Sequence, residues 1–279
     1  MLANFAVFIL SHGRPDRVLT YSTLKRRGYT GKIFIIVDDL DKTREQYIEK
    51  FGAENVIVFD KQAVANTTDQ GDNFNDLRST THVRNAIFDA AEQVGVEYFI
   101  QLDDDYTAFN HRFDAKLDYA PTACRNLDTV FSALLRFFEV SGADSIALAQ
   151  GGDFIGGAEC TFAEATRRKC MNSFICSTKR RFQFFSRLNE DVNTYLVLGS
   201  RGRLFFTVNQ VSLVQLQTQT NSGGMTDSYL KYGTYVKSFY SVMYHPSSVK
   251  VRKMSGRLHH SISWKHTVPM ILREEHRRI

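Results

Sequence analysis

The sequence predicts an α/β fold whose first half is a mostly parallel, Rossmann-like sheet. Between residues 5 and 110, short apolar runs of strand length alternate with segments of helical periodicity, the pattern of consecutive strand–helix units. The apolar runs are largely continuous, as expected for strands that are buried on both faces. Both observations favour a parallel sheet that is covered by helices on its two sides.

The first strand, the first helix and the second strand are the clearest elements. Residues 5–10 form the uninterrupted apolar run FAVFIL and predict a buried strand. Residues 17–27 carry apolar side chains at helical spacing, and Gly28 ends that pattern. Residues 32–37 are again largely apolar and predict a second strand, which ends at Asp38.

The same alternation continues to residue 102. Residues 43–51 predict a helix that Gly52 ends, and residues 55–59 predict a third strand. Residues 81–94 have helical periodicity, and the apolar residues 98–102 predict a fourth strand.

The second half has a different pattern but contains no linker. Residues 127–140 predict a helix with one apolar face, and a glycine-rich segment follows at 151–157. Residues 182–185 and 204–208 resemble strands. Because no repeat or low-complexity stretch interrupts the chain, we expect a single domain over residues 1–279. Its first half (1–110) and its mixed α/β second half (111–279) would share a cleft.

Charge is distributed unevenly along the chain. Residues 1–110 contain 12 Lys and Arg against 17 Asp and Glu, whereas residues 167–279 contain 19 against 5. A basic bias over this length favours a polyanionic partner, although a solvated basic face without a partner would have the same composition.

The sequence also bears on the compartment. No apolar run reaches the roughly 18 residues of a membrane span, and the apolar start lacks the basic flank of a signal peptide. The four cysteines form no CxxC pair and are expected to be reduced. We therefore expect a cytoplasmic protein without a membrane partner.

Three consecutive aspartates, Asp103, Asp104 and Asp105, directly follow the fourth predicted strand. Ligands bind at the carboxyl ends of strands in open parallel sheets. Three neighbouring carboxylates repel one another unless a cation neutralises them, and Mg²⁺ or Mn²⁺ prefers such oxygen ligands and bridges them to a diphosphate. We predict a divalent-metal site here; the alternative is a solvated acidic turn.

Polar residues also follow the first two strands. Ser11, His12 and Arg14 come after the first strand, and the planar guanidinium of Arg14 is suited to bind phosphate. Asp38 and Asp39 end the second strand, where a carboxylate can accept hydrogen bonds from a base or a ribose. A capped helix start and an ordinary turn would leave the same residues at these positions.

In this order, the motifs resemble the GT-A class of glycosyltransferases over roughly residues 5–110. The resemblance implies that Asp103 and Asp105 bind the metal and that Asp103 and Asp104 contact the diphosphate of a nucleotide-sugar donor, with a UDP-sugar as the first expectation. It also implies that Arg84 and Asn85 help to seat the donor, and that the first two strand ends contact its nucleoside.

The GT-A resemblance extends to an acidic pair in the second half. It implies that Glu190 or Asp191 activates the acceptor hydroxyl as a base, which requires hydrogen-bond reach of that hydroxyl. A local salt bridge to Arg187 or Arg201 is the alternative.

The resemblance further implies a late histidine that completes the metal coordination. His259 and His260 are the candidates, and His245 is a further one. Lys265 would then offset the charge of the departing diphosphate. A structural role for these histidines is the alternative.

The order SHGRP, VDD, RN, LDDD, NEDV and LHHSISWKHTVPMIL is similar to the TET-associated glycosyltransferases of bacteriophages, over nearly the whole chain. This resemblance implies sugar transfer to a 5-hydroxymethylpyrimidine, first of all 5-hydroxymethylcytosine, in double-stranded phage DNA. The basic second half agrees, because Lys and Arg contacts to phosphate dominate nucleic-acid affinity. The predicted DNA-binding residues are Arg167, Arg168, Lys169, Lys179, Arg180, Arg181, Arg201 and Arg203.

Two other functions fit part of the sequence. One is a GT-A glycosyltransferase that acts on a polysaccharide or another glycan. The other is a non-enzymatic nucleic-acid-binding protein with a degenerate donor site, which the intact aspartate triplet disfavours. A nucleotidyltransferase is disfavoured because no glycine-rich phosphate loop follows the first strand.

Overall fold

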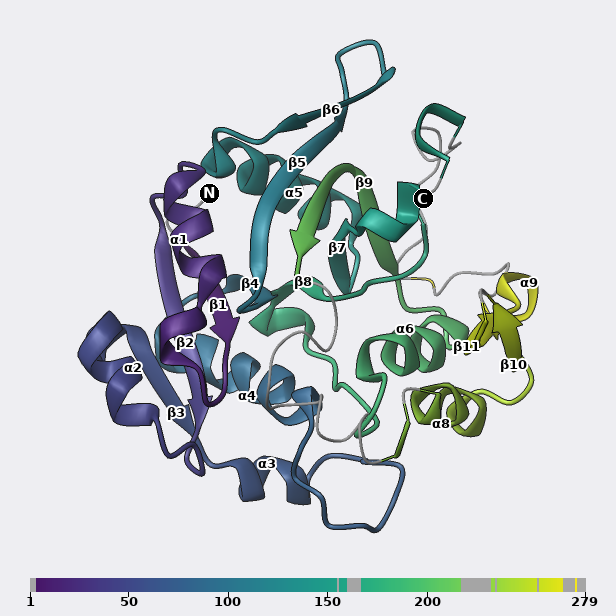
Figure 1. The fold of residues 1–279 in the computed structure, drawn as a ribbon, viewed down its shortest axis with the longest axis horizontal. Coiled ribbons are helices and arrows are strands. Elements are labelled where there is room, and N and C mark those ends of the chain that lie inside the picture. Colours follow the sequence, from purple (N-terminus) through teal and green to yellow (C-terminus); the bar gives the residue numbers. More distant parts are fainter. Residues whose placement is uncertain are drawn as a thin grey trace.

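A computed structural model describes residues 4–154, 156–159, 167–216, 232–233, 235–254, 256–267 and 274. Its centre is a nine-stranded sheet in the order β3-β2-β1-β4-β8-β7-β9-β5-β6 (Figure 1). The strands are β1 (Phe5–Leu10), β2 (Lys32–Asp38), β3 (Val56–Phe59), β4 (Tyr98–Asp103), β5 (Tyr106–Phe113), β6 (Tyr119–Ala123), β7 (Ser145–Ala149), β8 (Ser173–Ser177) and β9 (Phe205–Gln215). A separate antiparallel hairpin consists of β10 (Val249–Met254) and β11 (Arg257–Ile262).

The described helices lie around this sheet. They are α1 (Leu19–Arg26), α2 (Arg44–Phe51), α3 (Lys61–Asn66), α4 (Thr80–Gln93), α5 (Leu127–Ser141), α6 (Glu190–Ser200), α8 (Val236–Tyr244) and α9 (Trp264–Thr267). No described helix has the length and apolar character that crossing a membrane requires.

The first half of the chain forms the predicted parallel part of the sheet. β1 pairs in parallel with β2 and with β4, and β2 pairs in parallel with β3. All six residues of β1 are buried, which explains why its sequence is apolar without alternation. The predicted α/β class and the parallel arrangement of these four strands are confirmed.

Two apolar clusters lie on the two faces of the sheet. Phe5, Val7 and Ile9 point to one face and pack in a cluster with residues of α1, α2 and α5. Ala6 and Phe8 point to the other face, in a cluster with residues of α4 and α6. Because successive strand residues alternate between faces, one apolar strand contributes to both clusters.

The second half continues the same sheet with mixed pairing. β8 is antiparallel to both β4 and β7, β9 is parallel to β7 and antiparallel to β5, and β6 is antiparallel to β5. β4 and β7 therefore run in the same direction, and their carboxyl ends lie at the same edge of the sheet.

The predicted helices at 17–27, 43–51, 81–94 and 127–140 all form, and the strand predicted at 204–208 forms the start of β9, which begins at Phe205. α1 begins only at Leu19, because Pro15–Arg17 form a 3-10 turn. The strand predicted at 182–185 is wrong: this segment has no regular structure. Its Phe182 and Phe184 are buried side chains of the cluster next to α4, so their apolar character reflects packing.

Candidate active site

The carboxyl ends of β1, β2 and β4 meet at one edge of the sheet (Figure 1). In the parallel register, Leu10 of β1 lies opposite both Ile36 of β2 and Asp103 of β4. The residues that follow these strands therefore come together, as expected for ligand sites of open α/β sheets.

Asp104 faces the loop after β1. Its Oδ2 accepts a hydrogen bond from the hydroxyl of Ser11 (2.5 Å) and lies 3.0 Å from Nε of Arg14. The hydroxyl of Tyr47 contacts Ser11 Oγ (2.8 Å) and accepts a hydrogen bond from the backbone N–H of Arg14 (2.9 Å). Since Asp104 is 2% exposed, it holds this loop in place and is not open to a ligand.

A second group of charged residues lies at the end of β2. Asp38 is buried and contacts both Nδ1 of His12 (2.7 Å) and Nζ of Lys61 (3.2 Å). The hydrogen bond with Asp38 raises the pKa of His12. Asp41 is also buried and accepts a hydrogen bond from the backbone N–H of Gly13 (2.7 Å). Asp39, by contrast, is exposed, and its Oδ1 accepts a hydrogen bond from the backbone N–H of Lys61.

Arg84 of α4 joins the aspartate turn to the acidic pair of α6. Its Nη2 donates to Oδ1 of Asp103 (3.0 Å) and its Nε donates to Oε1 of Glu190 (2.9 Å). The guanidinium also lies over the ring of Phe174, at 4.9 Å. Burial lowers the pKa of Arg84, but the two carboxylates raise it by more, so the arginine stays charged. Glu190 therefore pairs with Arg84, whereas Arg187, one of the alternative partners considered above, pairs with Asp72 and Asp76.

Asp105 differs from the other two aspartates, because its carboxylate contacts no side chain among the described residues. It is partly buried, and its Oδ1 has no hydrogen-bond partner among the described residues. Burial raises the pKa of Asp105 to about 7, and the charges of Asp103 and Asp104 add to this rise. A buried carboxylate oxygen without a donor is costly, so this atom fits a role as ligand to a cation.

Asp103 and Asp105 alone offer few ligands. Among the described residues, no group of three or more His, Cys, Asp or Glu side chains is placed to hold a metal ion. Mg²⁺ commonly binds through one or two carboxylates, with substrate phosphates and water as the remaining ligands. Asp103 and Asp105 fit that kind of site, in which the diphosphate of a donor would complete the coordination.

The acidic pair begins α6. Asn189 has a left-handed backbone (φ 59°) that asparagine tolerates, and the helix starts at Glu190. Asp191 is buried, and its Oδ1 accepts the backbone N–H of Val192 (2.7 Å). Burial raises the pKa of Asp191, and the neighbouring Glu190 adds to the rise. Carboxylates in a first turn also interact favourably with the helix dipole.

The two adjacent histidines point to opposite faces of the β10–β11 hairpin, as successive strand residues do. His260 faces α6, where its Nδ1 lies 3.5 Å from Nδ2 of Asn189. His259 lies opposite Arg252 on the other face. Neither forms a metal-binding group with the aspartates in the described structure. His245 lies after the last residue of α8.

Lys265 lies on α9, next to Trp264, whose ring stacks on Tyr195 of α6 (5.8 Å between centroids). Lys265 is exposed. Because its neighbour Trp264 stacks on Tyr195, Lys265 lies near α6 beyond the first turn of that helix.

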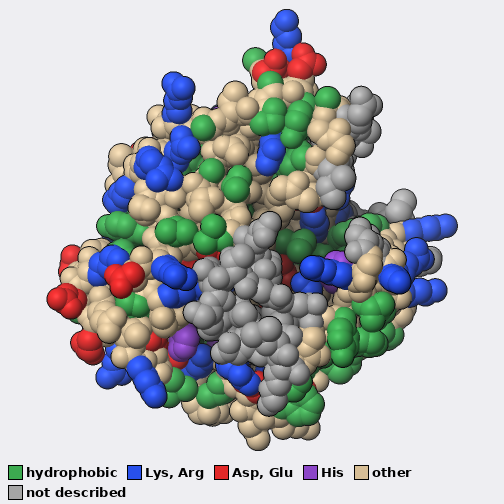
Figure 2. Space-filling model, viewed as in Figure 1, with side chains coloured by type: hydrophobic (Ala, Val, Ile, Leu, Met, Phe, Trp, Pro, Cys, Tyr) green, Lys and Arg blue, Asp and Glu red, His purple; other side chains and the backbone are tan. Residues whose placement is uncertain are grey.

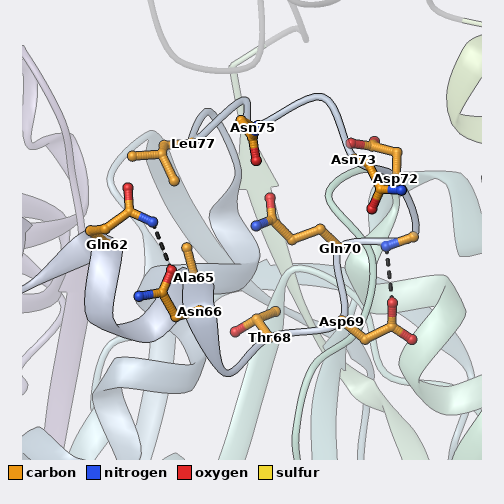
Figure 3. A pocket seen from close by; sticks show the side chains of 11 residues that line it. Gln62, Ala65, Asn66, Thr68, Asp69, Gln70, Asp72, Asn73, Asn75 and Leu77 are labelled. Atoms are coloured by element: carbon orange, nitrogen blue, oxygen red, sulfur yellow. Dashed lines mark hydrogen bonds between the residues drawn. The ribbon is translucent and has the colours of Figure 1, made fainter.

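Asn85 fixes the polypeptide around the site. Its Nδ2 donates to Thr68 Oγ1 and to the carbonyl of Phe184, and its Oδ1 accepts the N–H of Phe184. Thr68 in turn lines a cavity of about 810 Å³ between α3 and the following loop (Figure 3). Five amide side chains line this cavity: Gln62, Asn66, Gln70, Asn73 and Asn75. Asp69 and Asp72 also line it, so the lining is polar and carries two carboxylates.

One set of the predicted DNA-binding residues lies at the opposite edge of the sheet from the aspartates. Ser177 at the end of β8 pairs with Tyr98 at the start of β4, so residues 179–181 lie where β4 begins. Their side chains already have partners: Lys179 pairs with Glu97, Arg181 with Asp89 and Glu92, and Arg180 stacks on Phe138. Arg203 joins this edge, because it pairs with Asp144 and donates to the carbonyl of Arg181. Arg201 follows the last residue of α6.

The other set lies beside the end of β7. Lys169 and Arg167 lie 2.5 Å and 3.9 Å from Oδ1 of Asp153, and Arg168 lies over the ring of Phe206. Lys169 is largely buried, with a side chain 13% exposed. These three residues therefore serve contacts within the protein.

Sequence reasoning missed several residues that shape the site. Tyr47, Asp41 and Lys61 hold the ends of β1 and β2, and Asn189 contacts the hairpin. The sequence carried one usable signal, the closeness of Asp41 to the Asp38–Asp39 pair. Tyr47 and Lys61 lie on α2 and α3. The packing that brings these helices to the strand ends is not indicated by any local motif.

Comparison with known proteins adds the family. The family model described as TET-Associated Glycosyltransferase matches residues 5–224. No curated protein matches the chain. Similar solved structures include TarS residues 1–349 of S. aureus (12% identity, TM-score 0.44). The match covers 86% of this chain and 65% of that TarS chain. They also include glucosyl-3-phosphoglycerate synthase of Mycobacterium tuberculosis in complex with Mg²⁺ and UDP (10% identity, TM-score 0.47, covering 96% of this chain and 89% of that chain). The family match extends over most of the chain and confirms the predicted family: the chain belongs to the TET-associated glycosyltransferases.

Proposed function

We propose that this chain transfers a sugar from a nucleotide-sugar, first of all UDP-glucose, to a 5-hydroxymethylpyrimidine, first of all 5-hydroxymethylcytosine, in double-stranded DNA. The observation that carries the proposal is the arrangement at the end of β4. There, Asp103 is tied through Arg84 to Glu190 of α6, and Asp105 has a buried oxygen without a partner. In this arrangement, the carboxylates of the first half that would bind a metal lie close to an acidic pair of the second half.

The donor would occupy the edge formed by β1, β2 and β4. Asp103 and Asp105 would hold Mn²⁺ or Mg²⁺, and such a cation would neutralise charge that develops on the departing diphosphate. His12, which is about half exposed, and the exposed Asp39 are the groups of this edge that are open to the nucleoside. Ser11, Asp38, Asp104 and Asn85 act by fixing the loops around the donor.

Asp191 would act as the base. Glu190 already uses Oε1 to contact Arg84. Among the described residues, the Asp191 side chain accepts a hydrogen bond only from the backbone N–H of Val192. Its raised pKa suits proton transfer near neutral pH. In this step the acceptor hydroxyl forms a bond to the anomeric carbon, the bond from that carbon to the diphosphate breaks, and the hydroxyl proton passes to Asp191.

Family membership supports the nucleotide-sugar class. The DNA acceptor is supported by the family name and by the excess of basic residues in the second half. The predicted contacts at 167–169 and 179–181 give it less support, because those side chains have partners within the protein.

The test is a transfer assay with radiolabelled UDP-glucose and Mn²⁺. Duplex DNA that contains 5-hydroxymethylcytosine is compared with the same duplex containing cytosine. Label on the modified duplex alone supports donor and acceptor together. Metal-dependent hydrolysis of the donor without labelled DNA would refute the acceptor and favour a glycan. DNA binding without transfer or hydrolysis, over a panel of nucleotide-sugars, would refute the enzyme.

A further inference from the structure

The described residues of the β10–β11 hairpin include Lys and Arg but no Asp or Glu. Lys250, Arg252, Lys253 and Arg257 lie on it and are all exposed. The sequence contains no Asp or Glu between Asp227 and Glu274, so no carboxylate lies within the hairpin or close to it along the chain. Figure 2 shows Lys and Arg side chains gathered at the edge of the molecule where the hairpin lies in Figure 1.

These cations differ from the basic residues that sequence density had indicated. Lys169, Lys179, Arg181 and Arg203 each pair with a carboxylate. None of the four hairpin cations has a carboxylate partner within the part of the chain that the structure describes. An unpaired cation can bind phosphate without first breaking an internal ion pair.

The register of the hairpin gathers most of its charge on one face. Val249 is buried and marks the inner face. Because neighbours along a strand alternate, Lys250 and Arg252 point outward. Arg252 lies opposite His259, and Arg257 lies opposite Met254, so Arg257 shares the outer face. Lys250 and Arg252 are about 7 Å apart along the strand, which corresponds to the axial rise of about two nucleotides.

The inner face connects the hairpin to the candidate active site. Val249 and Ile262 pack with residues of α6 in one apolar cluster. His260 contacts Asn189, the residue directly before Glu190 and Asp191. A polymer bound to the outer face would therefore contact the hairpin, which packs against α6, the helix that carries the acidic pair.

We propose that the outer face of the β10–β11 hairpin, defined by Lys250, Arg252 and Arg257, binds the phosphate backbone of duplex DNA and so holds the acceptor. A two-stranded β-ribbon fits the major groove of B-DNA, and β-ribbons are a known way to contact DNA. The hairpin lies beyond the residues that the family model matches. The inference rests on the proposed function, because it names the surface that receives the proposed acceptor.

The test compares two triple variants. Lys250→Ala/Arg252→Ala/Arg257→Ala removes the outer-face charge. Lys32→Ala/Arg125→Ala/Arg136→Ala removes the same number of Lys and Arg from exposed positions elsewhere. Binding of a fluorescent duplex containing 5-hydroxymethylcytosine is measured by anisotropy over a salt series. Each lost phosphate contact lowers the slope of log K against log salt by about 0.9, so the hairpin variant should lose about 2.7 in slope and about 20- to 500-fold in affinity at 0.1 M salt. The control variant should lose less than about 3-fold.

Two further measurements keep the outcomes distinct. Arg252→Lys/Arg257→Lys keeps the charge and should keep the slope, and metal-dependent donor hydrolysis by all variants should equal that of the wild type. Wild-type slope and affinity in the hairpin variant would overturn the inference while leaving the transferase proposal intact. Wild-type protein that hydrolyses the donor but does not bind DNA would overturn both the acceptor and the hairpin role. If the hairpin variant loses binding to anionic phosphatidylglycerol vesicles but binds DNA like the wild type, the outer face would be assigned to a membrane surface. That result would also overturn the inference.

Discussion

Removal of Arg84 is the sharpest test of the site. The guanidinium donates to Asp103 (3.0 Å) and to Glu190 (2.9 Å), and its side chain is 2% exposed. Arg84→Met keeps most of the volume but leaves two carboxylates facing each other without a cation. Breaking a buried ion pair from one side costs about 3–5 kcal/mol. At about 2–4 °C per kcal/mol for a chain of this size, we expect Tm to fall by about 6–20 °C.

Arg181 provides a matched control. It also contacts two carboxylates, Asp89 and Glu92, but its side chain is 40% exposed. Exposed ion pairs contribute about 0–1 kcal/mol, so Arg181→Met should lower Tm by less than about 4 °C. Thermal unfolding of both variants, followed by circular dichroism at pH 7.5 without metal, gives the comparison. Equal small shifts would show that the burial of Arg84 does not set its contribution.

A second change separates charge from packing. If Arg84 acts by compensating Glu190, then Glu190→Gln should restore part of the Tm that Arg84→Met loses. Residues in direct contact give coupling energies of about 0.5–3 kcal/mol in such cycles. Strictly additive effects of the two changes would refute the bridge as a coupled unit.

Three further changes test the rest of the site. Asp105→Asn removes a carboxylate that the other two aspartates repel, so transfer should be lost while Tm without metal is unchanged or higher; a clear fall in Tm would contradict the repulsion. Asp191→Asn should lower kcat by about 10²–10⁴-fold, the usual contribution of a general base, with little change in the donor KM; full kcat in this variant would exclude Asp191 as the base. His12→Gln tests the raised pKa of His12, which contacts Asp38 and faces Asp41 and Lys61. A histidine whose pKa is raised in the folded state stabilises the fold at pH values below its unfolded-state pKa of about 6.5, and this stabilisation is lost as the pH rises through the folded-state pKa. His12→Gln should therefore lower Tm at pH 5.5 but not at pH 9. An equal loss at both pH values would contradict the His12–Asp38 pair.

The first half of the fold was predictable because its signals are local. β1 is buried on both faces and is apolar at every position, so its strand is visible in six consecutive letters. The aspartates directly follow a strand of the same kind, and a parallel sheet brings such strand ends together whatever the details of packing. The sequence was therefore enough to place Ser11, Asp38 and Asp103 at one edge.

The contacts that give each aspartate a different environment were not predictable. Asp104 turns toward Ser11, which is 93 residues away in sequence, and Arg84 reaches Glu190 across 106 residues. Such pairs depend on the order of strands in the sheet and on the packing of α4 against the second half. No local pattern indicates which of three neighbouring aspartates stays without a partner.

The basic residues show the same limit in another way. The density of Lys and Arg along the chain indicated residues 167–169 and 179–181, but carboxylates from other elements pair with several of them. Charge that remains available to a partner depends on what the fold places beside it. The hairpin cations are less dense in sequence, yet no described carboxylate lies against them, so the structure and not the sequence singles them out.

The position of Asp191 has a consequence for how DNA would be used. Asp191 is buried and lies two residues after Asn189, whose side chain contacts His260 of the hairpin. A base accepts a proton only at hydrogen-bond distance, about 2.6–3.2 Å, and a paired base inside a duplex on the outer face of the hairpin cannot approach a buried carboxylate that closely. The modified nucleotide must therefore leave the base stack, as enzymes that act on bases within duplexes require. Transfer to a mismatched or unpaired 5-hydroxymethylcytosine should then be faster than transfer to a paired one, since less pairing energy opposes extrusion. Equal rates on paired and unpaired substrates, measured under single-turnover conditions, would argue that the acceptor reaches Asp191 without base flipping.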